Sequence, residues 1–308
     1  MSLVGKRVVG SSGSIERRDF LRWSATGVVA TALGVPLLTA GTAQASGLTQ
    51  GLGVRAGRTL YSFTNGDSYV LFVDQVGAGL VTTTLFNTDF GSPHQAQIAR
   101  LQDGKSVKDF GAAIGMGNVP AALGMLVGFY GGPNVVATGA VQTTYQNLEA
   151  GQYILLCFVA DPGGPPHFVM GMFAGFEVVG PTAGLAAPRN VTATVQAADE
   201  KKYVIPAALR SHSVIRFENN ASKDVHEFTI GQLLPGKTID QVSTWAGNHQ
   251  GPPPFMPKGG NGALNPGEAG WFKLSLPRGN YVAFCLVPDD TSGTPHAADG
   301  MVSAFTVI

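Results

Sequence analysis

Residues 151–157 read Gly-Gln-Tyr-Ile-Leu-Leu-Cys, and residues 279–285 repeat this pattern as Gly-Asn-Tyr-Val-Ala-Phe-Cys. Each stretch begins at a glycine and continues as an uninterrupted apolar run, which is typical of a strand buried on both faces. An Asp-Pro or Pro-Asp pair ends each run shortly after its cysteine. We therefore predict two equivalent central strands, each in its own β-sandwich.

The repetition extends to residues before and after these strands. In both halves a His follows an Asn by seven residues, and a Pro-His pair and a Gly-Met pair follow the Cys. The His, Cys, His and Met recur at offsets of 132, 128, 129 and 129 residues, although most other identities between the halves have been lost. Their retention in register indicates a shared role for eight residues, which are His94, Cys157, His167 and Met172 in the first half and His226, Cys285, His296 and Met301 in the second.

A repeat of this length indicates two duplicated domains and not a solenoid. Glycine and proline are abundant and charged residues are few, which favours short strands joined by tight turns. We expect an all-β protein with one sandwich at residues 55–180 and a second at residues 200–308. Residues 181–199 are rich in Ala, Pro and Thr, and we expect them to form the linker.

Each predicted sandwich should also carry one short helix. Ser106 and Asp109 have the spacing of a helix capping box, and Thr238 and Gln241 have the same spacing in the second half. Residues 110–148 contain no charged side chain and many glycines. We expect a long loop packed on its own sandwich here, with a membrane-contacting surface as the alternative.

The N-terminus resembles a twin-arginine signal peptide. Residues 16–22 read Glu-Arg-Arg-Asp-Phe-Leu-Arg, a moderately apolar stretch follows at residues 23–38, and residues 43–45 form an Ala-x-Ala cleavage site. A glycine and a proline interrupt the apolar stretch, which is shorter than the roughly 18 apolar residues of a membrane span. We expect residues 1–45 to direct export through the twin-arginine pathway and to be removed, leaving a periplasmic or secreted protein with no membrane span.

The charge balance of the mature chain argues against two classes of partner. Removal of residues 1–45 takes away five of 20 basic and two of 20 acidic side chains, which leaves 15 basic and 18 acidic among 263 residues. A net charge near −3 provides no electrostatic attraction for nucleic acid or for an anionic membrane. We therefore expect neither as a partner.

The repeated residue types are the ligands of a known kind of metal site. One thiolate and two imidazoles with a more distant thioether hold copper in blue-copper electron-transfer sites. Sulfur suits Cu(I), nitrogen suits Cu(II), and a fixed geometry between these preferences keeps reorganisation small when one electron moves. Other interpretations stay open: the side chains could pack the core, the two cysteines could form a disulfide after export, and zinc could occupy the same His and Cys residues.

Each half is similar to the cupredoxin family, which includes plastocyanin, azurin and the type 1 domain of copper nitrite reductase. The family pattern is an Asn-containing turn, a His, a Gly-x-Tyr strand that ends in Cys, and a loop in which four residues separate a His from a Met. The resemblance covers residues 60–180 and 200–308. It implies two Greek-key cupredoxin-like sandwiches in tandem and one type 1 copper in each, up to two in all, held by the eight repeated residues.

Two features depart from the family pattern. The loop between the Cys and the second His has nine intervening residues in the first half and ten in the second, which is longer than in plastocyanin and closer to nitrite reductase. The residue after the first His, commonly an Asn that braces the loop, is Gln95 or Glu227. Both features bear on the copper geometry, and so on its potential, more than on the fold.

The sequence lacks the residues that connect a type 1 site to a second copper centre. Multicopper oxidases and nitrite reductases place a His directly before the type 1 Cys or use His-x-His pairs. Leu156 and Phe284 precede the cysteines here, and no His-x-His pair occurs. We therefore do not expect an enzyme of either kind. His212 and His249 have no counterparts in the first half, and we expect them at the surface or in turns.

Together these features predict an exported copper-binding protein that transfers electrons through type 1 copper to an unidentified redox partner. Two alternatives remain open. One is a metal-free cupredoxin-like binding module, and the other is copper sequestration without redox activity.

Overall fold

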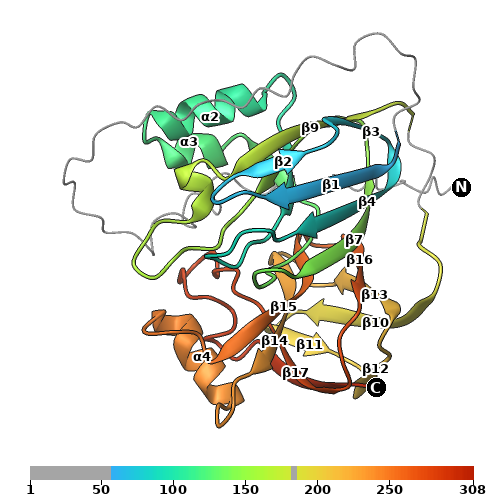
Figure 1. The fold of residues 1–308 in the computed structure, drawn as a ribbon, viewed down its shortest axis with the longest axis vertical. Helices are drawn as coiled ribbons and strands as arrows, with labels where there is room; N and C mark the ends of the chain where they lie inside the picture. The colour runs from blue at the N-terminus through green and yellow to red at the C-terminus, as the bar shows by residue number, and fades with distance from the viewer. Residues whose placement is uncertain (1–56, 182–185) are drawn as a thin grey trace, which may run out of the picture.

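The computed structural model describes residues 57–181 and 186–308, so the predicted signal peptide lies outside the described residues. Within these ranges the chain forms two β-sandwiches in tandem, the first above the second in Figure 1. One eight-stranded sheet runs through both sandwiches, and each sandwich is completed by a five-stranded sheet of its own. No helix of the described ranges is long and apolar enough to cross a membrane.

The shared sheet takes four strands from each half of the chain. Their bounds are β1 Thr59–Thr64, β2 Tyr69–Leu71, β4 Gly79–Phe86, β7 Val141–Leu148, β10 Val191–Ala198, β11 Lys202–Val204, β13 Ser213–Asn219 and β16 Ala269–Leu274. The order across the sheet is β2-β1-β4-β7-β16-β13-β10-β11. The two halves therefore join where β7 pairs with β16.

The two five-stranded sheets have matching positions in the two halves. In the first half the order is β3-β9-β8-β5-β6, and in the second it is β12-β18-β17-β14-β15. The bounds are β3 Gln75–Gly77, β5 Gln97–Leu101, β6 Leu126–Phe129, β8 Gly151–Leu156, β9 Phe173–Val179, β12 Ala208–Leu209, β14 His226–Leu233, β15 Phe255–Leu264, β17 Gly279–Phe284 and β18 Val302–Val307.

Strands β8 and β17 are the two central strands that the repeated stretches predict. Strand β8 is paired on both sides, by β5 and β9, and β17 is paired by β14 and β18. Their tyrosines, Tyr153 and Tyr281, are buried in the core. Each strand ends one residue before a cysteine, which places that thiol at the end of its sandwich.

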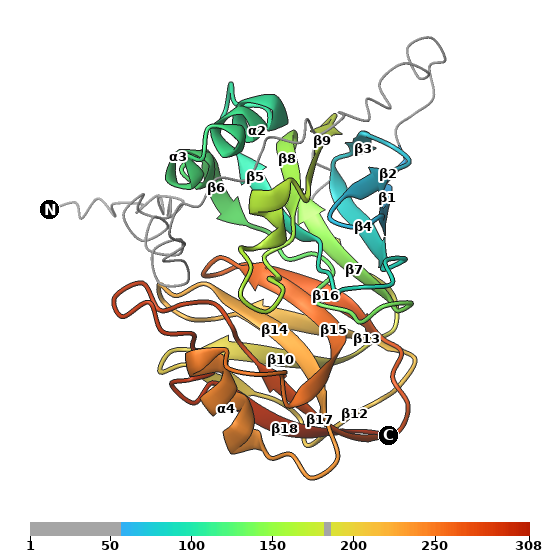
Figure 2. The same ribbon diagram turned by 60° about the vertical axis from the view of Figure 1, so that its left-hand side comes forward.

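Both predicted capping boxes begin a helix. Ser106 caps α2 (Val107–Gly115), and Thr238 caps α4 (Ile239–Asn248), with both reciprocal hydrogen bonds present in each. The first sandwich carries a further short helix, α3 (Val119–Leu123). Figure 2 shows α2 and α3 on the first sandwich and α4 on the second, at opposite ends of the molecule.

The segment predicted as a linker contains a strand. Strand β10 lies within residues 181–199, where it pairs in parallel with β13 and antiparallel with β11. Its alternating Val195 and Ala197 are fully buried, and this alternation is the signature of a half-buried strand. Residues 191–198 of the expected linker are thus part of the shared sheet. The domain limits themselves stay predictions.

Residues 110–148 do not form one long loop on their own sandwich. They include most of α2, all of α3, and strands β6 and β7. Between β6 and β7 the chain crosses to the second sandwich, where it forms three isolated antiparallel bridges: Tyr130 with Leu264, Pro133 with Asn261, and Val136 with Lys258. The uncharged stretch thus contributes to the contact between the sandwiches.

This contact pairs residues with their own counterparts in the repeat. Thr144 of β7 pairs with Phe272 of β16, and Pro133 bridges Asn261. The members of each pair are 128 residues apart, which is the offset between the glycines that begin β8 and β17. The two halves therefore meet about an approximate two-fold axis.

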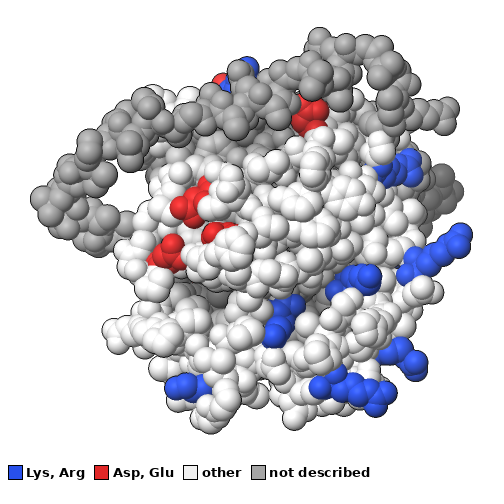
Figure 3. All heavy atoms as spheres, viewed as in Figure 1, with Lys and Arg blue, Asp and Glu red and all other residues white. Residues whose placement is uncertain are grey.

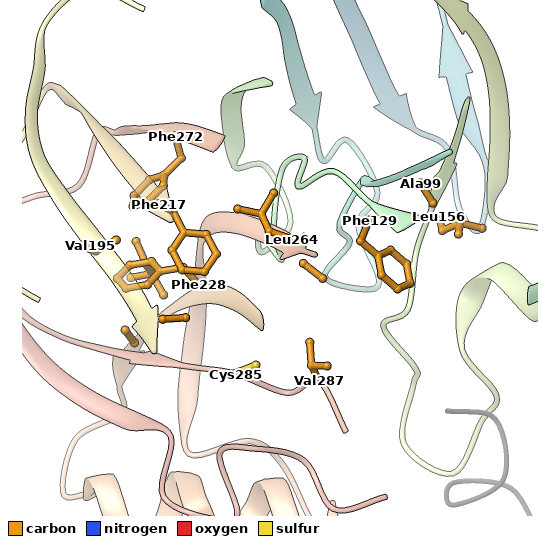
Figure 4. Close-up of a cluster of buried hydrophobic side chains, with 14 of the residues drawn as sticks. Ala99, Phe129, Leu156, Val195, Phe217, Phe228, Leu264, Phe272, Cys285 and Val287 are labelled. Atoms are coloured by element: carbon orange, nitrogen blue, oxygen red, sulfur yellow. The ribbon is translucent and has the colours of Figure 1, made fainter. Parts of the chain in front are cut away.

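The hydrophobic core is continuous across the contact. One cluster of buried side chains takes residues from both halves. In Figure 4, Leu264 and Phe129 lie between Phe217 and Phe228 of the second half and Leu156 of the first. The side chain of Gln97 adds polar contacts, since its Oε1 accepts from the Ala263 amide at 2.6 Å and its Nε2 donates to the Ala263 carbonyl at 3.0 Å.

Substitution of Gly260 should show how closely β15 approaches β14. A Cβ at Gly260 would lie 1.9 Å from the Phe228 carbonyl oxygen, and its φ of +117° is one that L-residues rarely adopt. Gly260→Ala should therefore lower the free energy of unfolding in urea by about 3 kcal/mol or more. Gly267→Ala is the matched control, because its φ is +80° with nothing within 4 Å, and it should cost only about 1 kcal/mol. Equal losses in the two variants would contradict this close approach.

Candidate metal centres

The first half brings one thiol and two imidazoles together at the end of its sandwich. His94 lies just before β5, Cys157 follows β8, and His167 begins a short 3-10 helix, η1 (His167–Met170). Cys157 Sγ is 3.7 Å from His94 Nδ1 and 3.5 Å from His167 Nδ1, and the two Nδ1 atoms are 3.1 Å apart. All three side chains are fully buried.

The second half builds the same arrangement from equivalent positions. His226 begins β14, Cys285 follows β17, and His296 lies in the loop before β18. Cys285 Sγ is 3.8 Å from His226 Nδ1 and 3.5 Å from His296 Nδ1, and the Nδ1 atoms are 3.0 Å apart. These two groups are the only sets of three or more His, Cys, Asp or Glu residues in the described ranges with donor atoms close enough to hold one metal ion.

Both methionines that the sequence singles out lie in the same loops. The Met172 amide donates to the His167 carbonyl at 2.9 Å, and the Cys157 amide donates to the Met172 carbonyl at 3.3 Å. The corresponding bonds join Met301 to His296 and Cys285 at 2.9 and 3.3 Å. Met172 and Met301 are buried, whereas Met170 is 46 % exposed. The backbone thus ties each Met directly to its Cys and His.

The spacing of the donor atoms fits one transition-metal ion in each group. Bonds of about 2.0 Å to nitrogen and 2.3 Å to sulfur, opened to about 120°, separate N and S by about 3.7 Å. The same nitrogen bonds opened to about 100° separate the two N atoms by about 3.1 Å. The observed separations of 3.5 to 3.8 Å and 3.0 to 3.1 Å match both values. Both cysteines are free, so the disulfide interpretation finds no support here.

Burial favours the uncharged form of both thiols and of the imidazoles of His167, His226 and His296 in the absence of metal. Desolvation raises the pKa of the Cys157 thiol to about 12 and that of Cys285 still further. It also lowers the pKa of His226 to about 4 and that of His296 to about 3. A thiolate in either group therefore needs a positive charge next to it in place of the lost water. A metal ion bound by the same residues would provide that charge.

The surroundings of the two groups differ in charge. His94 Nε2 is 3.0 Å from Asp89 Oδ2, and carboxylate oxygens of Asp67 and Asp161 lie 3.9 and 3.7 Å from ring nitrogens of His167. Within the described part of the chain, Nε2 of His226 and of His296 in the second group has no hydrogen-bond partner, and neither has Nε2 of His167 in the first. On the face shown in Figure 3, acidic side chains lie over the first sandwich and most of the basic ones over the second.

Several supporting residues are not apparent from the sequence. The Tyr69 hydroxyl donates to the Gln95 carbonyl, and the Tyr203 hydroxyl donates to the Glu227 carbonyl, so an equivalent tyrosine braces each group. Tyr69 and Tyr203 are 134 residues apart, close to the offsets of the repeated ligands, and this spacing could have revealed the pair. His212 and His249 belong to neither group, and both are exposed.

The burial of the thiols should be evident from their reactivity. Because the pKa of Cys157 is about 12 and that of Cys285 is higher, little thiolate exists at pH 8 in the folded, metal-free protein. Modification by an aromatic disulfide reagent should be at least about 100-fold slower in native buffer than in denaturant, where both thiols should react. Rapid labelling of the native protein, or fewer than two reactive thiols after unfolding, would contradict the buried free cysteines.

The metal-free protein should lose stability as the pH falls. Unfolded histidines titrate near pH 6.5, whereas the folded pKa values of His226 and His296 are about 4 and 3. Between these values the unfolded state binds more protons, so each histidine should lower the free energy of unfolding by up to about 1.4 kcal/mol per pH unit below 6.5. Urea unfolding at pH 7.5 and 5.0 measures this loss, and His296→Gln should make it smaller. A free energy that is unchanged or rises at pH 5.0 would contradict the buried neutral imidazoles.

Comparisons with known proteins gave similarities to solved structures alone. No protein-family model matches the sequence, and no curated protein matches it. Auracyanin A of Chloroflexus aurantiacus, described as a "blue" copper protein, is 14% identical over 38% of this chain and 98% of its own, with a TM-score of 0.26. Rusticyanin of Thiobacillus ferrooxidans is 16% identical over 40% of this chain and 79% of its own, with a TM-score of 0.28. A multicopper oxidase is 14% identical over 81% of this chain and 88% of its own, with a TM-score of 0.23.

Proposed function

We propose that this chain is an exported copper-binding protein that transfers single electrons through type 1 copper, with up to one copper in each sandwich. The observation that carries the proposal is the duplicated set of one thiol and two imidazoles, buried and spaced as three ligands of one ion. Copper bound there would alternate between Cu(I) and Cu(II). The burial of all six His and Cys side chains supports a bound metal ion over a role as solvated surface residues.

The protein's own residues would hold the geometry constant between the two redox states. His226 is the first residue of β14, and His94 lies just before β5, so a paired strand fixes each of them. The Cys, second His and Met of each half are joined by backbone hydrogen bonds within one loop. Complete burial of the ligands keeps water out. A rigid, dry site of this kind lowers the reorganisation that accompanies electron transfer.

The proposal does not include catalysis by a second copper centre. Leu156 and Phe284 occupy the positions directly before the cysteines, and both are fully buried strand residues without a donor atom. A connection of the oxidase or nitrite reductase kind would need a histidine at these positions. The redox partner, and export through the twin-arginine pathway, are parts of the proposal that depend on the sequence alone.

Copper sequestration is the second candidate function, and one observation favours it. None of the six His and Cys side chains is more than 1 % exposed, so no ligand edge reaches the surface where a partner would dock. Sequestration predicts tight Cu(I) binding without a reversible redox couple. Voltammetry of the copper-loaded protein separates the two functions, because electron transfer requires a reversible couple.

Copper titration tests the proposal directly. The chain should bind two equivalents of Cu(II) and develop an intense thiolate-to-copper band in the visible spectrum. His226→Ala removes one ligand of the second group and should reduce the tightly bound copper to one equivalent. His212→Ala is the matched control, since that histidine is exposed and lies in neither group, and it should leave two equivalents. Absence of the band in a protein with intact thiols would instead support a metal-free binding module.

A further inference from the structure

One side chain of the first sandwich is buried inside the second. Asn134 lies in the crossing segment between β6 and β7, and it is fully buried. Its Nδ2 lies 3.2 Å from Glu227 Oε2, 2.8 Å from Thr229 Oγ1 and 3.1 Å from the Asn261 carbonyl. All three acceptors belong to the second half. Its own Oδ1 accepts from the Val135 amide at 2.7 Å, which fixes the orientation of the amide group.

Glu227, the residue that Asn134 contacts, joins two ligand-bearing segments of the second metal group. It follows His226 directly on β14, and its side chain is buried. Its Oε1 accepts from the Leu286 amide at 2.9 Å, and Leu286 follows Cys285. The carboxyl group therefore fastens the end of β17, where the thiol lies, to the strand that carries His226.

We propose that Asn134 is a positioning residue of the second metal site, supplied by the first sandwich. It donates to Glu227 Oε2 and so leaves Oε1 aimed at the Leu286 amide. Without this donor, the buried carboxyl group of Glu227 would lose the hydrogen bond to its Oε2. It could regain one only by rotating, which would disturb the bond from the Leu286 amide to Oε1. The second sandwich alone then does not complete its own site. The expected effect on copper binding rests on the proposed function. The expected effect on the segment at Cys285 and Leu286 does not.

The approximate two-fold axis shows that the first site receives no equivalent support. The offset of 128 residues that relates Pro133 to Asn261 takes Asn134 to Gly262, which has no side chain. The residue that corresponds to Glu227 is Gln95. Loss of Asn134 should therefore affect the second site much more than the first.

The crossing segment also contacts the first site, through its backbone. The His94 amide donates to the Val136 carbonyl at 3.1 Å, and the Val136 amide donates to the His94 carbonyl at 2.9 Å. Val136 is two residues from Asn134. The same short segment thus holds a ligand of the first site with its backbone and braces the second site with a side chain.

Copper affinity in the full chain tests the proposal at the second site. In a His94→Ala background, which leaves only the second site intact, Asn134→Ala should weaken copper binding by about 10-fold or more in competition with a chelator. Gln142→Ala is the matched control. Gln142 also joins the sandwiches, through bonds to the Gly260 amide and the Lys273 carbonyl, but it does not contact Glu227. It should leave the affinity within about twofold of its parent, as expected for a residue outside the site.

Hydrogen exchange in the metal-free protein supplies a second, independent measurement. Exchange of the Leu286 amide should be faster in Asn134→Ala than in the parent or in Gln142→Ala. Glu227→Gln serves where Asn134→Ala does not fold, since it keeps an oxygen for Leu286 but turns an NH2 group toward the Asn134 amide. In the double variant Asn134→Ala with Glu227→Gln, the Leu286 amide should exchange no faster than in the faster-exchanging single variant. Both changes break the same Asn134–Glu227 contact.

The outcomes separate this inference from the proposed function. If the parent binds no copper, the proposed function fails, and the Leu286 exchange rate alone decides the positioning role. If the parent binds copper but Asn134→Ala changes neither the second-site affinity nor the Leu286 exchange rate, Asn134 is only a contact between the sandwiches. Equal weakening by Asn134→Ala and Gln142→Ala would also overturn the proposal, because it would trace the effect to general loosening of the interface.

Discussion

The exclusion of water from two sets of thiol and imidazole groups is the constraint on which the rest of the structure depends. Each set buries a thiol and at least one imidazole where desolvation disfavours the charged form, as the raised pKa of Cys157 and the lowered pKa of His296 show. A sandwich can hold such a set only if its surroundings fix every donor. The fixed strand ends, the hydrogen-bonded Cys-His-Met loops and the bracing tyrosines, Tyr69 and Tyr203, all serve this requirement.

The sequence predicts the elements whose signals are local. The repeated Gly-x-Tyr stretches identify β8 and β17, and the capping boxes at Ser106 and Thr238 identify α2 and α4. The structure brings the repeated His, Cys and His of each half together. The Cys, second His and Met are close in sequence and share one hydrogen-bonded loop, so only the first His must come from another part of the chain. Strand β10 also had a local signal, an alternation of small apolar residues, which the Ala, Pro and Thr content of the segment obscured.

What the sequence does not reveal depends on pairing between distant edges. Nothing in β7 or β16 alone indicates that the two strands meet, since either would suit the edge of an ordinary sandwich. Asn134, flanked by Pro133 and preceded by two glycines, has the local pattern of a turn. Its contact with Glu227 joins residues 93 positions apart. Residues 130–136 become part of the interface because the two halves pack about an approximate two-fold axis, and this packing has no local signal in the sequence.

The pairing of β7 with β16 resembles the contact between the two subunits of a symmetric dimer. Thr144 pairs with its own counterpart Phe272, so the same edge of each half meets the other, as in the self-complementary contact of a symmetric homodimer. Fusion of two such subunits covers both strand edges permanently, removes the dependence of assembly on concentration, and closes an edge that could otherwise recruit further copies. It also frees the two copies to diverge, and Asn134, whose counterpart in the repeat is Gly262, is an example of such divergence.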